Sequence, residues 1–313
     1  MVSKERQSLK EASGDDLTYR TSTTSFFSIY QRLESINDFL DNLIYEYPSL
    51  VSSFSIGKSY EGKDLRLIKI SSVNFKRQQQ QENLQRTSSN SSNSEANILK
   101  NNHVPPKNNP VPPKTTDPSK NEKREAIYLD GGFHAREWIS VSTALFLASK
   151  IPADYQAGDE GVRKLLDNYD VYILPVANPD GYEYTHTRDR LWRKTRSRHI
   201  PLGLSFFGCR GVDMNRNFNF HWNEVGSSDN PCTDIYAGPK AFSEPESKAI
   251  SDFLLAHKNQ MKMFFSLHSY GELWLTPWGE TSFVRLLWLL FDNSIIFYRF
   301  FPSLSLSLLV PSS

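Results

Sequence analysis

The chain has 313 residues, with 36 lysines and arginines against 35 aspartates and glutamates, for a net charge of +1. A balance this close to zero creates no global field for nucleic acid or an anionic membrane, so we expect neither as a partner. The length suits one large α/β domain or two small ones, and an aromatic content of 13% supplies a sizeable core.

The first predicted element is a helix over residues 30–47, where apolar side chains recur on one face until Pro48 stops the helix. Two strands follow, over residues 50–56 and 65–70, and residues 61–63 form the turn between them. Helix followed by hairpin is therefore the expected opening of the folded domain.

Residues 75–124 differ in character from what surrounds them. They contain a glutamine run, a Ser/Asn-rich stretch and a proline-rich stretch with lysines. Such a segment cannot bury enough apolar surface to fold, so we interpret it as a solvated loop inserted into the domain, with a partner-binding tail as the alternative. Asn90 begins a glycosylation sequon, which matters only if the chain is secreted.

Two candidate metal ligands, His134 and Glu137, follow the apolar run 126–129, which reads as a buried strand. Open α/β sheets place ligand sites at the carboxyl ends of strands, and Gly131 and Gly132 let the backbone turn there. An imidazole and a carboxylate three residues apart can reach one ion, and catalytic zinc takes three protein ligands plus water. Taken alone, a histidine and a glutamate at this spacing often occur by chance and do not establish a metal site.

The third candidate ligand is His268, at the end of another strand-like run. A single histidine after a strand is more often a surface residue, so the argument depends on both histidines ending strands. The remaining predicted elements are helices over 139–151, 162–168 and 244–257, strands over 171–176, 261–267 and 273–275, a turn at Asn178–Gly181, and a long loop region over 185–235. A long ordered loop region in a compact domain usually marks a site.

Five stretches carry a family resemblance. They are His134–Trp138, Asn178–Tyr182, Arg190–Arg196, Gly211–Phe218 and His268–Tyr270. In this order they resemble the motifs of zinc metallocarboxypeptidases of the carboxypeptidase A/B type. The resemblance implies an α/β fold in one domain, with a mixed parallel and antiparallel sheet flanked by helices. It also implies one Zn²⁺ per chain and hydrolysis of the C-terminal peptide bond of peptides or proteins.

The resemblance also assigns roles to residues. His134, Glu137 and His268 would hold the zinc ion, and Asp213 would accept the proton of a ligand histidine. Arg193 would polarise the scissile carbonyl and stabilise the oxyanion. The implied substrate contacts are Arg136, Arg190, Asn215, Arg216, Ser269 and Tyr270. Taken singly, each arginine would read as a solvated charge, and Tyr270 as a core aromatic.

The two cysteines, Cys209 and Cys232, could form a disulfide or remain two buried thiols. The resemblance implies that they are paired, which suits an oxidising, extracellular compartment. The first 24 residues point the other way: they are polar, contain no apolar run typical of a signal peptide, and are expected to be disordered.

The resemblance stops after Gly279. The expected catalytic domain is therefore residues 25–281, incomplete at its C-terminal side, followed by a divergent apolar tail over 282–313. Charges interrupt this tail and its apolar runs are short, so we expect an exposed segment rather than a membrane anchor.

The family's general-base glutamate, its substrate-covering tyrosine and its pocket residue should all follow Gly279. The sequence offers no counterpart for them there. We expect a monomeric metallocarboxypeptidase, and the alternative is a pseudo-enzyme that binds zinc and peptide C-termini without turnover.

Overall fold

The computed structural model describes residues 25–76, 80, 124–199, 209–275 and 305–309. In chain order the elements are α3 (Leu33–Glu46), β1 (Val51–Lys58), β2 (Asp64–Ile70), β3 (Glu125–Asp130), α5 (Trp138–Ala157), α6 (Glu160–Asn168), β4 (Tyr169–Leu174), α7 (Pro179–Thr187), the 3₁₀ turn η1 (Met214–Arg216), α9 (Pro245–Ala256), β5 (Met261–His268), β6 (Trp274–Leu275) and β7 (Ser305–Leu309). The expected α/β architecture is confirmed.

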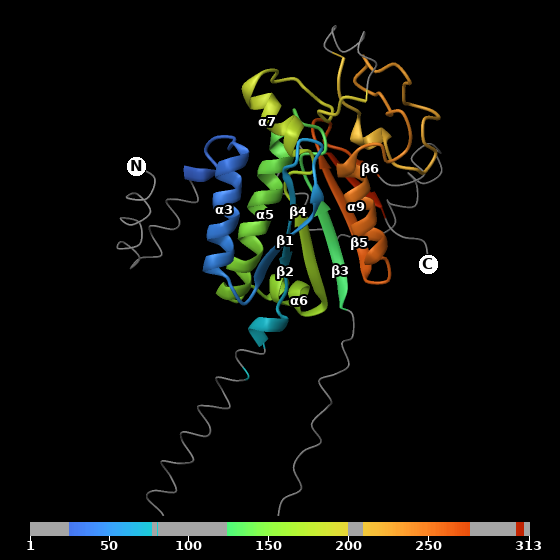
Figure 1. Ribbon diagram of the computed structural model, residues 1–313. Coiled ribbons are helices and arrows are strands. Elements are labelled where there is room, and N and C mark those ends of the chain that lie inside the picture. Colours follow the sequence, from blue (N-terminus) through green and yellow to red (C-terminus); the bar gives the residue numbers. More distant parts are fainter. Residues whose placement is uncertain (1–24, 77–79, 81–123, 200–208, 276–304, 310–313) are drawn as a thin grey trace, which may run out of the picture.

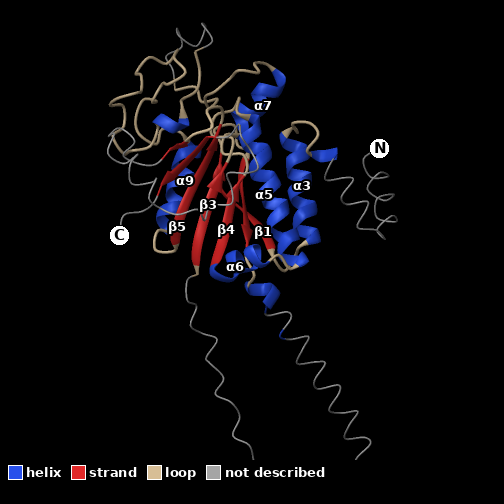
Figure 2. Ribbon diagram, turned by 180° about the vertical axis from the view of Figure 1, so that it is seen from behind, coloured by secondary structure: helices blue, strands red, loops and turns tan. Residues whose placement is uncertain are grey.

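One mixed sheet forms the centre, with strand order β1-β2-β4-β3-β5-β7-β6. β3 pairs in parallel with β4 on one side and with β5 on the other. β2 pairs antiparallel with β1 on one side and with β4 on the other. Helices α3 and α5 cover one face of the sheet and α9 covers the other (Figures 1 and 2). The sheet is therefore buried on both sides over its central strands.

Alternation along the strands divides the core between these two faces. In β4, Ile173 joins the cluster that packs against α3 and α5, while its neighbours Tyr172 and Leu174 join the cluster that packs against α9. In β2, Ile68 and Leu67 divide in the same way. Because successive side chains of a strand point to opposite faces, a strand buried on both sides must be apolar throughout.

The predicted helix over 139–151 exists but runs farther, from Trp138 to Ala157. Pro152 removes one backbone donor but does not end the helix, because the following turn is held by packing: the Tyr155 side chain is buried and its ring contacts Phe75 edge-on. Gly158, in the left-handed conformation with φ 90°, ends α5 instead.

The predicted turn at Asn178–Gly181 is in fact the start of helix α7. The Asn178 side chain accepts a hydrogen bond from the Gly181 backbone N–H, and Pro179 occupies the first helical position. Asparagine and proline favour both turns and helix starts, so the local sequence does not distinguish the two.

Residues 305–309 lie within the stretch that we expected to be an exposed tail. They form β7, which pairs antiparallel with β5 and parallel with β6. The rest of the tail lies outside the described residues, as do residues 1–24 and most of the predicted insertion.

The long connections gather at one end of the sheet, the upper end in Figure 1, where β3 and β4 finish. The described part breaks off shortly after Lys76 and resumes at Arg124, directly before β3, which begins at the opposite end of the sheet. Both places contact the same region, since Lys76 pairs with Asp167 and Arg124 donates to the Leu166 carbonyl. Lys76 and Arg124 therefore lie near each other, at the end of the sheet away from the long connections.

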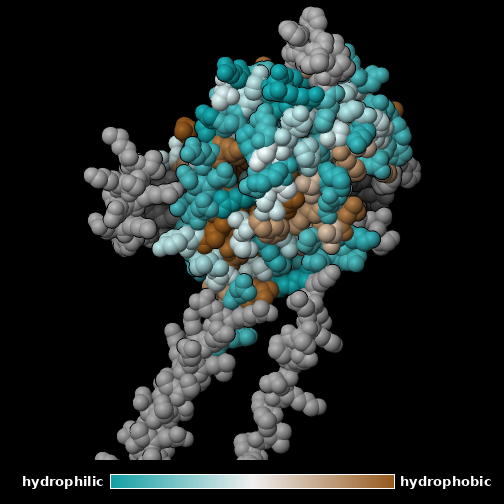
Figure 3. Space-filling view, viewed as in Figure 1, coloured by the Kyte–Doolittle hydropathy of each residue, from teal (hydrophilic) through white to brown (hydrophobic). Residues whose placement is uncertain are grey.

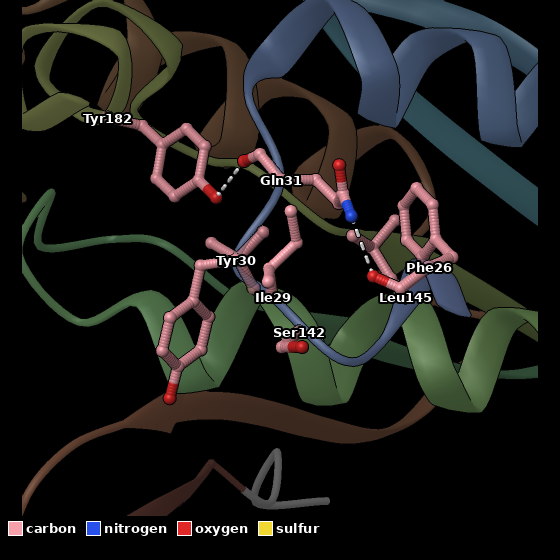
Figure 4. Close-up of a pocket in the computed structure, with 8 residues that line it drawn as sticks. Phe26, Ile29, Tyr30, Gln31, Ser142, Leu145 and Tyr182 are labelled. Atoms are coloured by element: carbon pink, nitrogen blue, oxygen red, sulfur yellow. Dashed lines mark hydrogen bonds between the residues drawn. The ribbon is translucent and has the colours of Figure 1, made fainter. Parts of the chain in front are cut away.

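The segment before α3 packs against α5 (Figure 4). The Tyr182 hydroxyl donates to the Gln31 carbonyl at 2.6 Å, and the Gln31 amide donates to the Phe26 carbonyl at 2.7 Å. A small crevice remains between this segment, Leu145 of α5 and Tyr182 of α7. The bond from Tyr182 joins the segment before α3 to α7, and the bond from Gln31 holds that segment in its own conformation.

The face of the molecule seen in Figure 3 is mostly hydrophilic, and its apolar residues form small groups. Within the described ranges, no helix combines the length and the apolar character that crossing a bilayer requires.

Two buried carboxylates hold the turn between β1 and β2. Asp180, at the start of α7, accepts hydrogen bonds from the Ser59 hydroxyl, the Glu61 backbone N–H and the Lys63 ammonium. Glu246, in α9, is fully buried and accepts from the Tyr60 backbone N–H at 2.9 Å, while its second carboxyl oxygen has no hydrogen-bond partner. Burial, reinforced by the nearby carboxylates of Glu244 and Asp180, raises the pKa of Glu246 to about 8.

We predict that Glu246→Gln flattens the pH dependence of stability. The folded pKa of about 8 lies above the ordinary value of 4.5, so protonated Glu246 contributes stability below pH 4.5 that is lost as the pH rises through 8. Each pKa unit corresponds to about 1.4 kcal/mol. Glutamine keeps the acceptor for Tyr60 and removes the titration. Urea unfolding between pH 5 and 9 measures the effect, with exposed Glu34→Gln as the matched control. If the free energy of unfolding changed with pH by the same amount in wild type and in Glu246→Gln, the prediction would be wrong.

Candidate metal centre and active site

The pairing of β3 with β5 brings the two predicted histidines to one place. The strands are parallel neighbours, with Asp130 opposite Ser266. His134 follows Asp130 by four residues, and His268 follows Ser266 by two. Both histidines therefore lie at the carboxyl edge of the sheet, as the sequence predicted.

A tight turn at Gly131 and Gly132 brings His134 back over this edge. Gly132 has φ 66°, a conformation that glycine adopts without strain. A Cβ atom at Gly131 would lie 2.5 Å from the Ser140 carbonyl oxygen, and the Ser140 hydroxyl accepts from the Gly132 backbone N–H. The turn is thus packed directly onto the first turn of α5.

The three predicted ligands converge. His134 Nδ1 lies 2.8 Å from Glu137 Oε1, His268 Nδ1 lies 3.0 Å from Glu137 Oε2, and the two Nδ1 atoms are 3.1 Å apart. His134 and Glu137 are buried, and the His268 side chain is 12% exposed. The candidate ligand atoms of all three residues lie within 4.8 Å of one another, and together they form a group that could hold a metal ion.

The outer nitrogens of both imidazoles have acceptors. His134 Nε2 faces Asp213 Oδ1 at 3.2 Å, and His268 Nε2 faces the Ser266 hydroxyl at 3.2 Å. Ser266 donates its own proton to Asp130, so it accepts from His268. Each ring is then protonated on Nε2, and each Nδ1 presents a lone pair to the group.

Three acceptors that face one another at about 3 Å repel unless positive charge lies between them. Burial lowers the pKa of His134, but the contacts with Asp213 and Glu137 outweigh burial and raise it. At His268, burial and the nearby His134 outweigh the contact with Glu137, so its pKa lies below the ordinary value. Burial raises the pKa of Glu137, but the bonds with His134 and His268 bring it to about 2. The two carboxylates therefore favour positive charge beside His134, whereas burial keeps His268 neutral.

We call the three candidate ligands His134, Glu137 and His268 the metal group. Arg193 is joined to the metal group through Asp213. Its Nε and Nη2 donate to Asp213 Oδ2 at 3.0 and 2.9 Å, and its Nη1 lies 3.9 Å from Glu137 Oε1. Asp213 is fully buried, and its other oxygen accepts from His134 and from the Asn215 backbone N–H. One carboxylate thus positions a candidate ligand and the candidate oxyanion arginine together.

The other predicted site residues surround this core at differing depths. The Ser269 backbone N–H donates to Glu137, and Tyr270 is 94% exposed. Asn215 is exposed. Arg216 donates from Nε to the Gly226 carbonyl and from Nη1 to the Asn215 carbonyl.

Arg136 and Arg190 both contact neighbouring backbone. Arg136 donates to the Leu191 carbonyl and to the Asp234 carboxylate, and Arg190 donates to the Arg136 carbonyl. The Cys209–Cys232 disulfide, which the family resemblance implied, is present and ties the loop that contains Arg216.

Two structural residues of the site escaped the sequence analysis. Asn217 is fully buried, and its side chain bonds the carbonyls of Ala237 and Lys240, the Ser243 hydroxyl and the Glu244 N–H. Its place directly after Arg216 in a polar motif was the available signal. Ser266 offered none, because a serine inside a strand does not reveal its partner.

Comparison with known proteins agrees with this geometry. A family model described as zinc carboxypeptidase matches residues 36–304.

The chain belongs to the zinc carboxypeptidase family.

Among curated relatives, carboxypeptidase B of Astacus astacus is 37% identical over 81% of this chain and 65% of its own length. Carboxypeptidase A2 of Rattus norvegicus is 36% identical over 81% of this chain and 48% of its own length. The chain thus spans between about half and two thirds of these relatives.

Solved structures of the family are similar in fold. Bovine thrombin-activatable fibrinolysis inhibitor, in complex with tick carboxypeptidase inhibitor, matches with a TM-score of 0.59 and 30% identity over 82% of this chain and 66% of that one. Carboxypeptidase A from Helicoverpa armigera also gives 0.59 and 30%, over 80% of this chain and 48% of that one.

Zinc, the metal that names the family, fits the donor set. Two zinc–nitrogen bonds of about 2 Å at a tetrahedral angle separate the nitrogens by roughly 3.3 Å, close to the 3.1 Å between the two Nδ1 atoms. Two neutral imidazoles and a carboxylate, with the outer nitrogens held by acceptors, are one of the ligand sets of catalytic zinc.

We predict that the buried carboxylate of Asp213 strengthens zinc binding. Asp213→Ala should lower zinc affinity about 10- to 100-fold, because His134 loses the acceptor that orients it. His268→Ala should abolish stoichiometric binding. Competition with a chelator measures both effects. His221→Ala, which removes an exposed histidine paired with Glu224, is the matched control. Unchanged affinity in Asp213→Ala would refute the assigned role.

Proposed function

We propose that this chain is the catalytic part of a zinc-dependent metallocarboxypeptidase that removes the C-terminal residue of peptides or proteins. The observation that carries the proposal is the convergence of His134, Glu137 and His268 at one edge of the sheet, with Arg193 joined to them through Asp213. Family membership supports the same reaction class.

In this proposal His134, Glu137 and His268 hold the ion, which when bound supplies an acidified water and polarises the scissile carbonyl. Arg193 stabilises the negative charge that develops on the carbonyl oxygen. It suits this role because Asp213 fixes its Nε and Nη2, while Nη1 faces the metal group at 3.9 Å from Glu137. Asp213 keeps the His134 proton on Nε2.

Recognition of a C-terminus requires a group that binds a carboxylate. Arg216 is our candidate, because its planar fork can bind a carboxylate bidentately, and two bonds to backbone carbonyls of the same loop hold it in place. Asn215 is next to it and exposed. Arg136, Arg190, Ser269 and Tyr270 are the further substrate contacts that the family resemblance suggests.

The general base is the open element of the proposal. Most of the stretch in which the family resemblance places it, after Gly279, lies outside the described residues. Its loss would cost about 10²–10⁴ in rate, so a form that binds zinc and C-termini without turnover is the alternative outcome.

We further propose the domain arrangement that the sequence suggested: a catalytic unit over residues 25–281 with a solvated insertion before β3. The insertion is supported by the neighbouring anchor points of Lys76 and Arg124 at the end of the sheet away from the metal group. Long surface insertions are tolerated because the free energy of loop closure grows slowly with length. The disulfide supports an extracellular location.

The decisive experiment follows hydrolysis of blocked dipeptides ending in Phe, Leu or Arg by the zinc-loaded chain. We expect release of the C-terminal residue, loss of activity in His134→Ala, and full activity in the exposed control His221→Ala. The same dipeptides with a C-terminal amide should not be cleaved, because Arg216 then has no carboxylate to bind. Stoichiometric zinc binding without any turnover would overturn the proposal and establish the alternative.

We predict that Arg193→Ala lowers kcat about 10²–10³-fold with a small change in KM, because the residue acts on charge present only in the transition state. Arg193→Lys should recover part of this loss. Steady-state kinetics on the best dipeptide measures both variants. A rise in KM at constant kcat would instead assign Arg193 to ground-state binding.

A further inference from the structure

Arg190 lies at one end of a stack of planar groups beside the metal centre. Its guanidinium carbon is 3.7 Å from the centroid of the Trp138 ring, and the other side of that ring stacks on His186 at 4.0 Å with an angle of 5° between the planes. Trp138 follows the ligand Glu137 directly. The stack therefore clamps the residue at which the metal-bearing turn becomes helix α5.

Hydrogen bonds fix the ring of Trp138 from the side. Its indole N–H donates to the Thr185 hydroxyl at 2.7 Å, and that hydroxyl donates to the Tyr182 carbonyl. Tyr30, from the segment before α3, contacts the same ring edge-on at 5.5 Å. The ring has a single orientation, so it offers Arg190 a fixed platform.

Arg190 also joins two segments of backbone. It donates from Nη1 to the Arg136 carbonyl at 2.9 Å, and Arg136 donates in return to the Leu191 carbonyl. A third bond runs from the Ala135 N–H to the Arg193 carbonyl at 3.0 Å. The turn that carries His134 and Glu137 is thus bonded at three points to the segment that carries Arg193.

We infer that Arg190 is a positioning residue that fixes the segment of Arg193 against the metal-bearing turn, and that its contact with Trp138 is the means. This inference rests on the proposed function. It differs from the family resemblance, which suggests a substrate contact. Because the guanidinium covers an aromatic face and bonds a protein carbonyl, its main partners lie within the chain.

The chemistry of His186 supports this arrangement. Burial, with the positive charges of Arg32 and Arg190, lowers the pKa of His186 to about 4. The ring beneath Trp138 is therefore neutral at ordinary pH and does not repel the guanidinium on the other side. The carboxylate of Glu183, from the same helix α7, pairs with Arg32.

The test compares Arg190→Lys and Arg190→Met with Arg188→Met, an exposed arginine two residues away. Lysine keeps the charge but has neither the flat face nor the fork. Arg190 is exposed, so these variants should fold. The first readout is hydrogen exchange over residues 134–138, which needs no activity. The second is steady-state kinetics on a dipeptide and on a longer peptide with the same C-terminal residue.

If Arg190 positions the segment, both Arg190 variants exchange faster over residues 134–138 and lose about 10- to 100-fold in kcat on both substrates, with KM within about twofold. Lysine does not rescue. Arg188→Met behaves as wild type. If Arg190 instead contacts substrate, exchange is unchanged, KM rises for the longer peptide, and lysine recovers much of the loss. That result would overturn the inference.

An inactive wild-type chain would count against the proposed function only. In that case hydrogen exchange still decides the inference, because faster exchange in the Arg190 variants and not in Arg188→Met would uphold it, and equal exchange would refute it.

Discussion

The structure depends on the register between β3 and β5, in which Asp130 stands opposite Ser266 and accepts its hydroxyl proton at 2.6 Å. A slip of one residue would turn every side chain of β5 to the other face of the sheet and carry His268 away from His134. The Ser266 hydroxyl also faces His268 Nε2 at 3.2 Å, so strand register and ligand orientation depend on the same side chain. Burial raises the pKa of Asp130 to about 7, although the Ser266 bond opposes that rise. The strand pairing that assembles the site thus includes a buried polar group whose hydrogen bond becomes part of the site.

Asp213 extends this order from the metal group to Arg193. It comes from the loop that the disulfide ties, not from a strand, yet it is fully buried and accepts from His134, Arg193 and Asn215. With so many donors its carboxylate remains ionised, and its pKa lies well below the ordinary range despite burial. The negative charge balances Arg193, so the arginine can stand near a cation site without being expelled. The charge balance at Asp213 therefore acts together with apolar packing to hold this loop, since the adjacent Met214 is buried in the cluster that packs against α9.

The sequence predicted those features that local pattern determines. The amphipathic period of α3 and the apolar runs of β3, β4 and β5 were enough to place strand ends, and hence His134 and His268. Three features required the folded chain. Asn178 and Pro179 fit a turn as well as a helix start, so α7 was missed. The predicted helix over 139–151 ended too early, because the packing of Tyr155 keeps the chain helical past Pro152. Asn217 bonds groups twenty or more residues away, and no local pattern reveals such partners. The contacts of the arginines were equally out of reach, because a long side chain can lie along many directions.

Those arginines show how the site divides its positive charge. A guanidinium has five N–H donors. Arg193 donates hydrogen bonds from Nε and Nη2 to Asp213, and Arg216 donates from Nε and Nη1 to carbonyls of its own loop. Each is therefore held along one edge by the protein and keeps donors for another partner. Arg190 differs, because its flat face lies on Trp138 and its Nη1 bonds backbone. A donor that is already fixed loses little conformational entropy when a carboxylate or an oxyanion arrives, so it stabilises that charge more than a mobile side chain would. On this argument the proposed function assigns the substrate contacts to the arginines held along one edge, and the role inferred for the arginine held by its face is to maintain the distance between them and the metal group.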